Sequence, residues 1–321
     1  MTPPASAGEF RVAFEAMAGR NEIVVGGVAP EVAGAAIAAA IAEVRRIEAK
    51  YSRYRPDSVV SLINASAGSE LGVEIDAETA ALLDFAGTLF VSSDGLFDVT
   101  SGPLRRAWNF REARVPAEAE LAPLLFLVGW QLVERQAGSV RLPRAGMELD
   151  FGGIGKEYAA DRARAALERE GVAHGLVNLA GDIALVGPRA DGTAWSLGVQ
   201  HPRDADATCA SVRLARGALA TSGDYERFFV TPEGRRCCHI LDPRTGQPVS
   251  HWQSVSVIAP TCAAAGALST IAMLLGVQAL AFLRAQHVSF LAIDAAGRTH
   301  ARDIDNSFVD SRSSHEAPQP S

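Results

Sequence analysis

The stretch ATSGDYERFFVTPEGRRCCHILDPRTGQPV, residues 220–249, decides the fold. Apolar and β-branched residues predict strands at 227–230 and 235–241, separated by turn-forming residues. Glycine, hydroxyl, carboxylate and imidazole side chains crowd into TSGD (221–224) and HILDPRTG (239–246). Loops held by strands concentrate binding and catalytic residues. The stretch therefore predicts strands that hold a functional site.

Further strands and helices are predicted on both sides of this stretch. Strands are expected at residues 177–186, 194–200, 210–214 and 254–259, and hairpins within 126–151. Helices are expected at 30–51, 76–93 and 262–275, with a short one capped by Asp57-Ser58 and another running to Gly171. Strands and helices are mixed rather than alternating. The order predicts an α+β fold with a large, mostly antiparallel sheet core and flanking helices.

The composition limits how many domains the chain can form and which classes of partner it attracts. The 321 residues are 48% hydrophobic, which is enough for a large core, and no repeat or long linker divides them. One domain is expected at 10–310, with a flexible N-terminus at 1–9 and a disordered Ser- and Pro-rich tail at 311–321. The net charge of −7 gives no global attraction to nucleic acid or anionic membranes.

The cysteines and the N-terminus bear on the compartment. Cys209, Cys237, Cys238 and Cys262 have neither CxxC nor metal-ligand spacing, and the adjacent pair is expected inside a strand. The first residues show no leader pattern, and no long uncharged apolar run is expected to form a membrane segment. The sequence therefore predicts a cytoplasmic protein.

Two further segments carry polar groups beside predicted strands. In DFGGIGKEYAAD (150–161), amides at a helix start can hold an anion, and Lys156 adds a positive charge. The segment matches neither standard phosphate loop, because Tyr158 replaces a glycine and Glu157 replaces a hydroxyl residue. A tight strand-to-helix turn is an equally open reading. VNLAGD (177–182) is typical of an Asn/Asp turn.

Six segments, taken in order, resemble the ApbE family of FAD:protein FMN transferases, and the resemblance spans residues 10–308. They are YSRYRPDSVVSLIN (51–64), FDVTSGPL (97–104), DFGGIGKEYAAD, VNLAGD, ATSGDYERFF (220–229) and HILDPRTGQPV (239–249). The resemblance implies a T-fold-related single domain. It also implies transfer of FMN from FAD to a Ser or Thr hydroxyl of an acceptor flavoprotein, with AMP leaving and Mg²⁺ assisting.

The resemblance also assigns site residues. Attack at a diphosphate phosphorus needs an in-line nucleophile, charge neutralisation and a base. Catalytic roles fall on His239, as base or phosphate contact, and on Asp242 and Thr245. The residues implied in cofactor binding are Met17, Tyr51, Trp108, Phe110, Asp150, Lys156, Asp182, Thr221, Ser222 and Leu241.

The implied metal ligands are a backbone carbonyl near Gly153 and an Asp and a Thr four residues apart in the helix at 262–275. Thr270 is present, but Gly266 stands at the Asp position. Glu157 stands where the family usually has a glycine. If the pocket is otherwise intact, Gly266→Asp is expected to strengthen metal-dependent activity.

The glycine at the expected carboxylate position leaves three functions open. The first is an active transferase that uses another carboxylate, such as Asp182 or Asp224, at the metal. The second is an FAD-binding protein with weakened or lost transferase activity. The third is an FAD pyrophosphatase that releases FMN and AMP to water.

Overall fold

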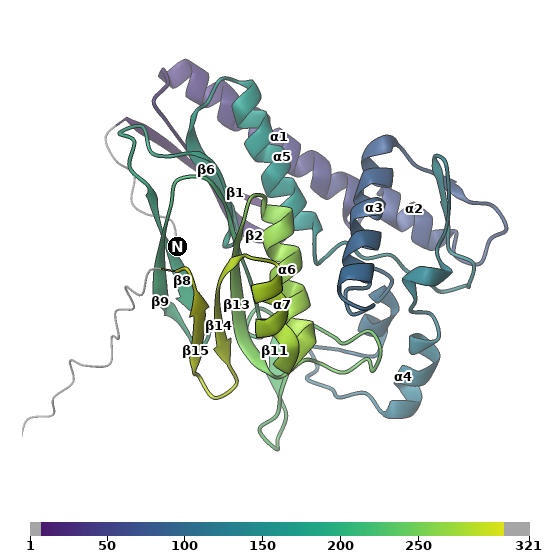
Figure 1. Cartoon of the computed structure of the whole chain (residues 1–321). Helices are drawn as coiled ribbons and strands as arrows, with labels where there is room; N and C mark the ends of the chain where they lie inside the picture. Colours follow the sequence, from purple (N-terminus) through teal and green to yellow (C-terminus); the bar gives the residue numbers. More distant parts are fainter. Residues whose placement is uncertain (1–7, 305–321) are drawn as a thin grey trace, which may run out of the picture.

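The protein is built on one large antiparallel sheet, seen in the computed structural model, which describes residues 8–304 (Figure 1). All neighbouring strands of the sheet pair antiparallel. In spatial order the eight strands are β1 (Glu9–Ala16), β2 (Gly19–Gly26), β6 (His174–Leu179), β7 (Asp182–Gly187), β10 (Gly217–Gly223), β13 (Trp252–Ala259), β14 (Ser289–Asp294) and β15 (Thr299–Arg302). The predicted α+β class is confirmed. The expected disordered tail at 311–321 and residues 1–7 of the expected flexible N-terminus lie outside the described residues.

One face of the sheet is covered by helices, chiefly α1 (Pro30–Tyr51), α5 (Gly155–Arg169) and α6 (Cys262–Leu275). Helix α5 lies beside α1 and α6, and α6 packs on β10 and β13 (Figure 1). The ribbon β8 (Trp195–His201) and β9 (Asp204–Leu214) covers the other face. Strand β7 is therefore buried on both faces: Ile183 packs with Trp195, and Ala184 belongs to the core under the helices.

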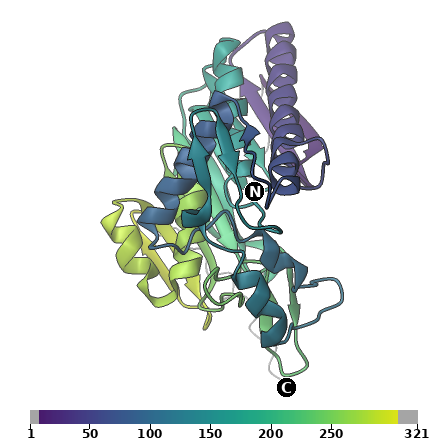
Figure 2. The ribbon, with the colours of Figure 1, turned by 90° about the vertical axis from the view of Figure 1, so that its right-hand side faces the viewer.

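The chain between α1 and α5 forms a separate layer beside the sheet, and this layer faces the viewer in Figure 2. It contains α2 (Val59–Ala65), β3 (Val73–Glu74), α3 (Ala77–Ser92), η1 (Gly102–Arg106), α4 (Glu118–Leu125), η2 (Trp130–Leu132), β4 (Glu134–Gln136) and β5 (Ser139–Arg141). Further along the chain come β11 (Phe228–Val230), β12 (Arg236–Cys238), η3 (Gly276–Gln278) and α7 (Ala279–Ala285). Glycine loop 150–154 leads from this layer back to the sheet through α5.

The helix predictions agree closely with the structure, since α1 spans 30–51, α3 spans 77–92 and α6 spans 262–275. The predicted cap at Ser58 is confirmed, because its hydroxyl accepts the amide of Ser61 at 3.0 Å. The single strand predicted at 177–186 is wrong. Ala180 and Gly181 adopt φ values of 50° and 99°, and their tight turn divides the segment into β6 and β7.

Strands β1, β2, β3, β10, β14 and β15 were not predicted. The most consequential of them is β10, a central strand that ends in Thr221, Ser222 and Gly223. These polar and small residues were interpreted as a loop, whereas neighbouring β7 and β13 hold them in the sheet. Tertiary pairing overrides the weak strand preference of the glycines and alanines in β10.

The expectation of no long apolar run is wrong. Residues Cys262–Ala285 are long and apolar enough to cross a membrane by length and composition, with a hydropathy of 1.9. In the structure this run is α6, η3 and α7, and α6 packs on β10 and β13. A helix buried in a protein core has the same composition, so the run is weak evidence of a membrane span.

The adjacent cysteines lie inside a strand, as predicted. Cys237 and Cys238 belong to β12 and are fully buried. The thiols of Cys209 and Cys262 are also free, so the described residues contain no disulfide.

Candidate functional site

The glycine loop places a lysine against the β6–β7 turn. Lys156 lies in the first turn of α5, and its ammonium group donates to the carboxylate of Asp182 and, at 3.2 Å, to the carbonyl of Leu179. The other oxygen of Asp182 accepts the amide of Thr221 at 3.0 Å. Three of the six quoted segments therefore meet at one point, where Asp182 contacts both Lys156 and Thr221, while the cofactor-binding role of these residues stays a prediction.

The Lys156–Asp182 pair is strongly electrostatic. Asp182 is 2% exposed. Burial by itself would lower the pKa of Lys156, but the negative charge of Asp182, followed by that of Glu157 when it is ionised, outweighs burial and holds that pKa above its usual value. Lys156 therefore stays protonated at neutral pH and provides a fixed positive charge.

A cluster of hydroxyl groups adjoins this pair. Thr221 Oγ1 is 2.8 Å from Ser256 Oγ, and Ser222 Oγ is 2.8 Å from Ser269 Oγ and 2.9 Å from Thr270 Oγ1. We call Thr221, Ser222, Ser256, Ser269 and Thr270 the hydroxyl cluster. It brings the predicted residues on β10 together with Thr270 of α6. Ser256 and Ser269 were missed, although Ser269 directly precedes the predicted Thr270.

Glu157 occupies the space beside Gly266. A Cβ atom added to Gly266 would lie 2.9 Å from Cδ and 3.1 Å from Oε1 of Glu157, and closer still to Cγ. The condition on which Gly266→Asp was expected to strengthen metal-dependent activity, an otherwise intact pocket, is not met because Glu157 fills the space, and the effect on activity stays a prediction. Any side chain at residue 266 must first displace Glu157.

Burial and charge both act on the carboxyl group of Glu157. Burial, followed by the negative charge of Asp182, raises the pKa of Glu157 to about 8, and Lys156 opposes that rise. Its Oε2 atom finds no hydrogen-bond partner among the described residues. This carboxyl group needs a proton or a cation, because a bare charge in such a place is costly.

Asp161 fixes the position of α6 against α5. Its two carboxylate oxygens accept the amides of Cys262 and Ala263, each at 2.9 Å. These are the first amides of α6, which have no partner within the helix. Asp161 lies one helical turn beyond Glu157 on α5, so this cap helps to set the approach of Gly266 to Glu157.

Cationic side chains gather on the other side of the glycine loop. Arg53 pairs with Asp150, which the resemblance had assigned to the cofactor, and donates to the hydroxyl of Tyr54 at 2.7 Å. Arg227 lies near the Tyr54 hydroxyl, and its carbonyl accepts the amide of His239 at 2.9 Å. Arg53 and Arg227 were missed as site residues, although both lie inside quoted segments.

The imidazole of His239 is neutral at physiological pH. Desolvation by the surrounding protein atoms, followed by the positive charge of Arg227, lowers the pKa of His239 to about 4. Solvent still reaches this residue, which is exposed by its accessible surface. His239 is therefore open to a ligand.

The HILDPRTG segment forms a turn that is bonded largely to itself. Asp242 accepts the backbone amide of Arg244 at 2.8 Å and pairs with its guanidinium at 3.2 Å. Thr245 Oγ1 accepts the amide of Gln247 at 3.2 Å. These side chains shape the turn, so the catalytic roles implied for Asp242 and Thr245 stay predictions.

An aromatic cluster supports this turn. Trp108 is 3% exposed and donates from Nε1 to the carbonyl of Gly246 at 2.7 Å. Its ring stacks on Phe110 at 6.2 Å and contacts Phe229, and half-buried Leu241 packs on the same cluster. The structure gives Trp108 a packing role, while cofactor contact by Phe110 and Leu241 stays a prediction.

Two residues assigned to the cofactor make contacts within the protein. Tyr51 is 6% exposed, packs edge-on against Phe151 and shares a 3.2 Å hydrogen bond with Thr79. Met17 lies in the β1–β2 turn, where its amide donates to Glu48 at 2.6 Å. Tyr51 is thus a core residue, and a cofactor contact by the half-buried Met17 stays a prediction.

The residues considered as metal ligands differ in whether their surroundings suit a cation. Among residues 8–304, no group of three or more His, Cys, Asp or Glu side chains could hold an ion. Gly153 lies in the loop before α5, where an added Cβ would meet the ring of Phe97 at 3.1 Å. Asp224 is not a free carboxylate, because Arg203 binds both its oxygens at 2.6 and 2.7 Å. The unpartnered oxygen of Glu157 is the feature that fits a cation.

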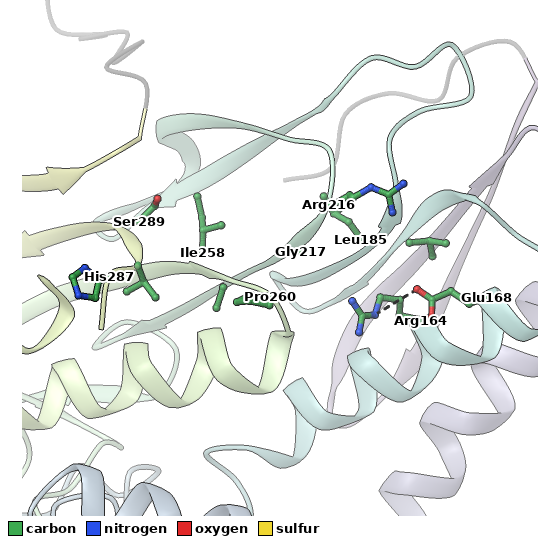
Figure 3. A pocket seen from close by; sticks show the side chains of 12 residues that line it. Arg164, Glu168, Leu185, Arg216, Gly217, Ile258, Pro260, His287 and Ser289 are labelled. Atoms are coloured by element: carbon green, nitrogen blue, oxygen red, sulfur yellow. Dashed lines mark ion pairs between the residues drawn. The ribbon is translucent and has the colours of Figure 1, made fainter. Parts of the chain in front are cut away.

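A cavity of about 560 Å³ lies elsewhere, over the opposite ends of β10 and β13 (Figure 3). Arg164, Arg216, Gly217, Pro260 and His287 line it. It is an open depression that holds none of the predicted site residues. The chemistry that the sequence predicted lies at the other ends of these strands.

The fold and the site define an α+β protein in which a half-buried lysine, a cluster of hydroxyl groups and two arginines gather around the glycine loop and the end of β10. The chain belongs to the ApbE family, whose model matches residues 17–292. The FAD:protein FMN transferase of Klebsiella pneumoniae (strain 342) is 34% identical over 268 residues, 81% of each chain. That of Treponema pallidum (strain Nichols) is 34% identical over 70% of this chain and 67% of the relative.

Solved structures agree with this membership. The ApbE protein of Thermotoga maritima superimposes with a TM-score of 0.85 at 31% identity, covering 92% of this chain and 97% of that one. The apo form of the flavinyl transferase ApbE of Pseudomonas stutzeri gives a TM-score of 0.80 at 29% identity, covering 92% and 95%.

Proposed function

We propose that this protein transfers FMN from FAD to a Ser or Thr hydroxyl of an acceptor flavoprotein and releases AMP. Membership of the ApbE family and relatives named FAD:protein FMN transferase support this activity. The observation that carries the proposal is the meeting of the DFGGIGKEYAAD, VNLAGD and TSGDYER segments at the Lys156–Asp182–Thr221 contact.

The reaction exchanges one phosphorus–oxygen bond for another. The acceptor oxygen bonds to the phosphorus of the FMN half, and the bond from that phosphorus to the AMP oxygen breaks. AMP leaves with the bonding electrons, and the hydroxyl proton passes to a base. Negative charge builds up on the phosphoryl oxygens, so fixed cations lower the barrier. We assign this role to Lys156, Arg53 and Arg227.

His239 is the proposed base. Its pKa of about 4 leaves the imidazole unprotonated at neutral pH, so one ring nitrogen can accept the hydroxyl proton. A diphosphate bound beside Arg227 and Arg53 would offset the positive charges that lower this pKa. The basicity of His239 would then rise when FAD is bound, which is when a base is needed.

Magnesium is part of the proposal as a bound cofactor. Bound Mg²⁺ would supply neutralising charge to the diphosphate oxygens. Oxygen ligands suit this hard cation, and the chain offers the hydroxyl of Thr270, a carbonyl near Gly153 and the carboxyl group of Glu157. A cytoplasmic location is likewise a proposal, based on the sequence alone.

The test is an adduct assay with the purified protein, FAD, Mg²⁺ and an acceptor domain that carries a target threonine. We expect a fluorescent acceptor band whose mass has increased by one FMN group, and release of AMP. A matched acceptor with valine at the target position is the control. FAD binding without an adduct would support the binding-protein alternative. FMN and AMP release without an adduct would support the pyrophosphatase.

A further inference from the structure

Gly266 of α6 leaves space that is filled by the side chain of Glu157 from α5. An added Cβ at residue 266 would lie 2.9 Å from Cδ of Glu157, a separation that real Cβ atoms do not show. Gly266 lies inside a helix, where glycine costs about 1 kcal/mol relative to alanine. Its φ angle needs no glycine, since it is not among the positive values. The space taken by Glu157 is therefore the local reason for a glycine at this position.

Glu157 directs a carboxyl group into that space without a complete set of partners. The residue is 8% exposed, and its Oε2 atom has no hydrogen-bond partner among the described residues. The neighbouring charges do not balance when both acids are ionised, because Lys156 supplies one positive charge against Glu157 and Asp182. One further positive charge would neutralise the group.

Oxygen donors lie on the adjacent face of α6. Thr270 is four residues after Gly266, so both lie on the same face of the helix. Ser222 of β10 hydrogen-bonds to Thr270 at 2.9 Å, and Ser269 is anchored to the carbonyl of Gly266 at 2.9 Å. A carboxylate with hydroxyl and carbonyl oxygens is the donor set that a divalent hard cation prefers.

We propose that Glu157 supplies the protein carboxylate to the divalent cation of this site, and that Gly266 is required to let it do so. The inference rests on the proposed function for the presence of the cation. The carboxylate thus comes from α5 rather than α6, and the residues at 157 and 266 act as one steric unit. The alternative is a structural Glu157 that shares a proton with Asp182 and binds no cation.

The first test measures affinity for Mn²⁺, a paramagnetic substitute for Mg²⁺, by electron paramagnetic resonance on the full chain with FAD present. We expect Glu157→Gln to weaken Mn²⁺ binding at least about tenfold. FAD affinity, followed by flavin fluorescence without metal, should remain near the wild-type value. Glu168→Gln removes an acid further along α5 and should leave Mn²⁺ binding unchanged. Wild-type affinity in Glu157→Gln would overturn the inference.

The second test exchanges the two residues. Glu157→Gly should lose cation affinity, and Gly266→Asp should also lose it because the new side chain collides with Glu157. The double variant Glu157→Gly/Gly266→Asp should regain about tenfold over Glu157→Gly, since a carboxylate then fills the same space from α6. A double variant no better than Glu157→Gly would contradict the steric unit. Thermal unfolding of metal-free protein checks that each variant is folded.

These binding measurements stay separate from the transfer reaction. If the wild-type protein binds Mn²⁺ through Glu157 but forms no adduct, the inference holds and the proposed function fails. If Glu157→Gln lowers adduct formation without weakening Mn²⁺ binding, the proposed function holds and the inference fails.

Discussion

Replacing Lys156 by methionine removes the positive charge that faces Asp182 and keeps an unbranched side chain on α5. Asp182 is 2% exposed and would remain buried beside Glu157 without its cation. Removing one partner of a buried ion pair costs about 3–5 kcal/mol of folding free energy. Because the side chain of Lys156 is itself 27% exposed, we expect the lower end of that range, about 3 kcal/mol.

Urea unfolding at pH 7, followed by circular dichroism, measures this change. Arg162→Met is the matched control on the same helix, because Arg162 pairs with Glu43 at 2.9 Å through a side chain that is 39% exposed. Such a pair contributes less than about 1 kcal/mol, so the control should unfold near the wild-type midpoint. If Lys156→Met costs no more than Arg162→Met, the Lys156–Asp182 contact is not the stabilising pair described above.

Three further variants test separate parts of the structure. Asp76→Ala should destabilise the protein by about 1 kcal/mol at pH 7, because Asp76 caps α3. Lys50 lowers the pKa of Asp76 to about 2. The stability that the Asp76 carboxylate contributes is therefore fully present above pH 4 and is lost as the pH falls through 2. If urea titrations at pH 7 and pH 2 show equal destabilisation by Asp76→Ala, this pH dependence is contradicted. Gly223→Ala should cost about 1–3 kcal/mol, because a Cβ would collide with the ring of Tyr225; an unchanged thermal midpoint would refute that collision. His239→Ala should lower adduct formation at least about a hundredfold and leave the thermal midpoint unchanged, and full activity would exclude His239 as the base.

The local elements and the segments of the site were predictable from the sequence. Helix α1 was predicted at 30–51 because apolar residues recur at helical spacing, and Ser58 was identified as a cap from residue type and position. The segments around Lys156, Asp182 and Thr221 were singled out because each combines polar groups with a strand end. Strand β10 was not predicted, because four of its seven residues are glycine or alanine, which are weak strand formers, and its neighbours are distant in sequence.

Some predicted site residues proved to support the fold. Trp108 was assigned to the cofactor, but its indole anchors the turn at Gly246. Tyr51 was assigned likewise and lies in the core against Phe151. A resemblance identifies positions, whereas burial and hydrogen bonding decide whether a side chain faces a ligand or its own protein.

The sequence alone determined the α+β class, the positions of helices α1, α3 and α6, and the six segments that mark the family. It also showed two departures from the family pattern, Glu157 and Gly266, but only as separate changes. The tertiary structure decided that these residues fill one space, although 109 positions separate them (266 − 157). Periodicity and residue type report local conformation. The meeting of α5 with α6 depends on how both helices pack on the sheet, and that packing makes a glycine on one helix the complement of a carboxylate on the other.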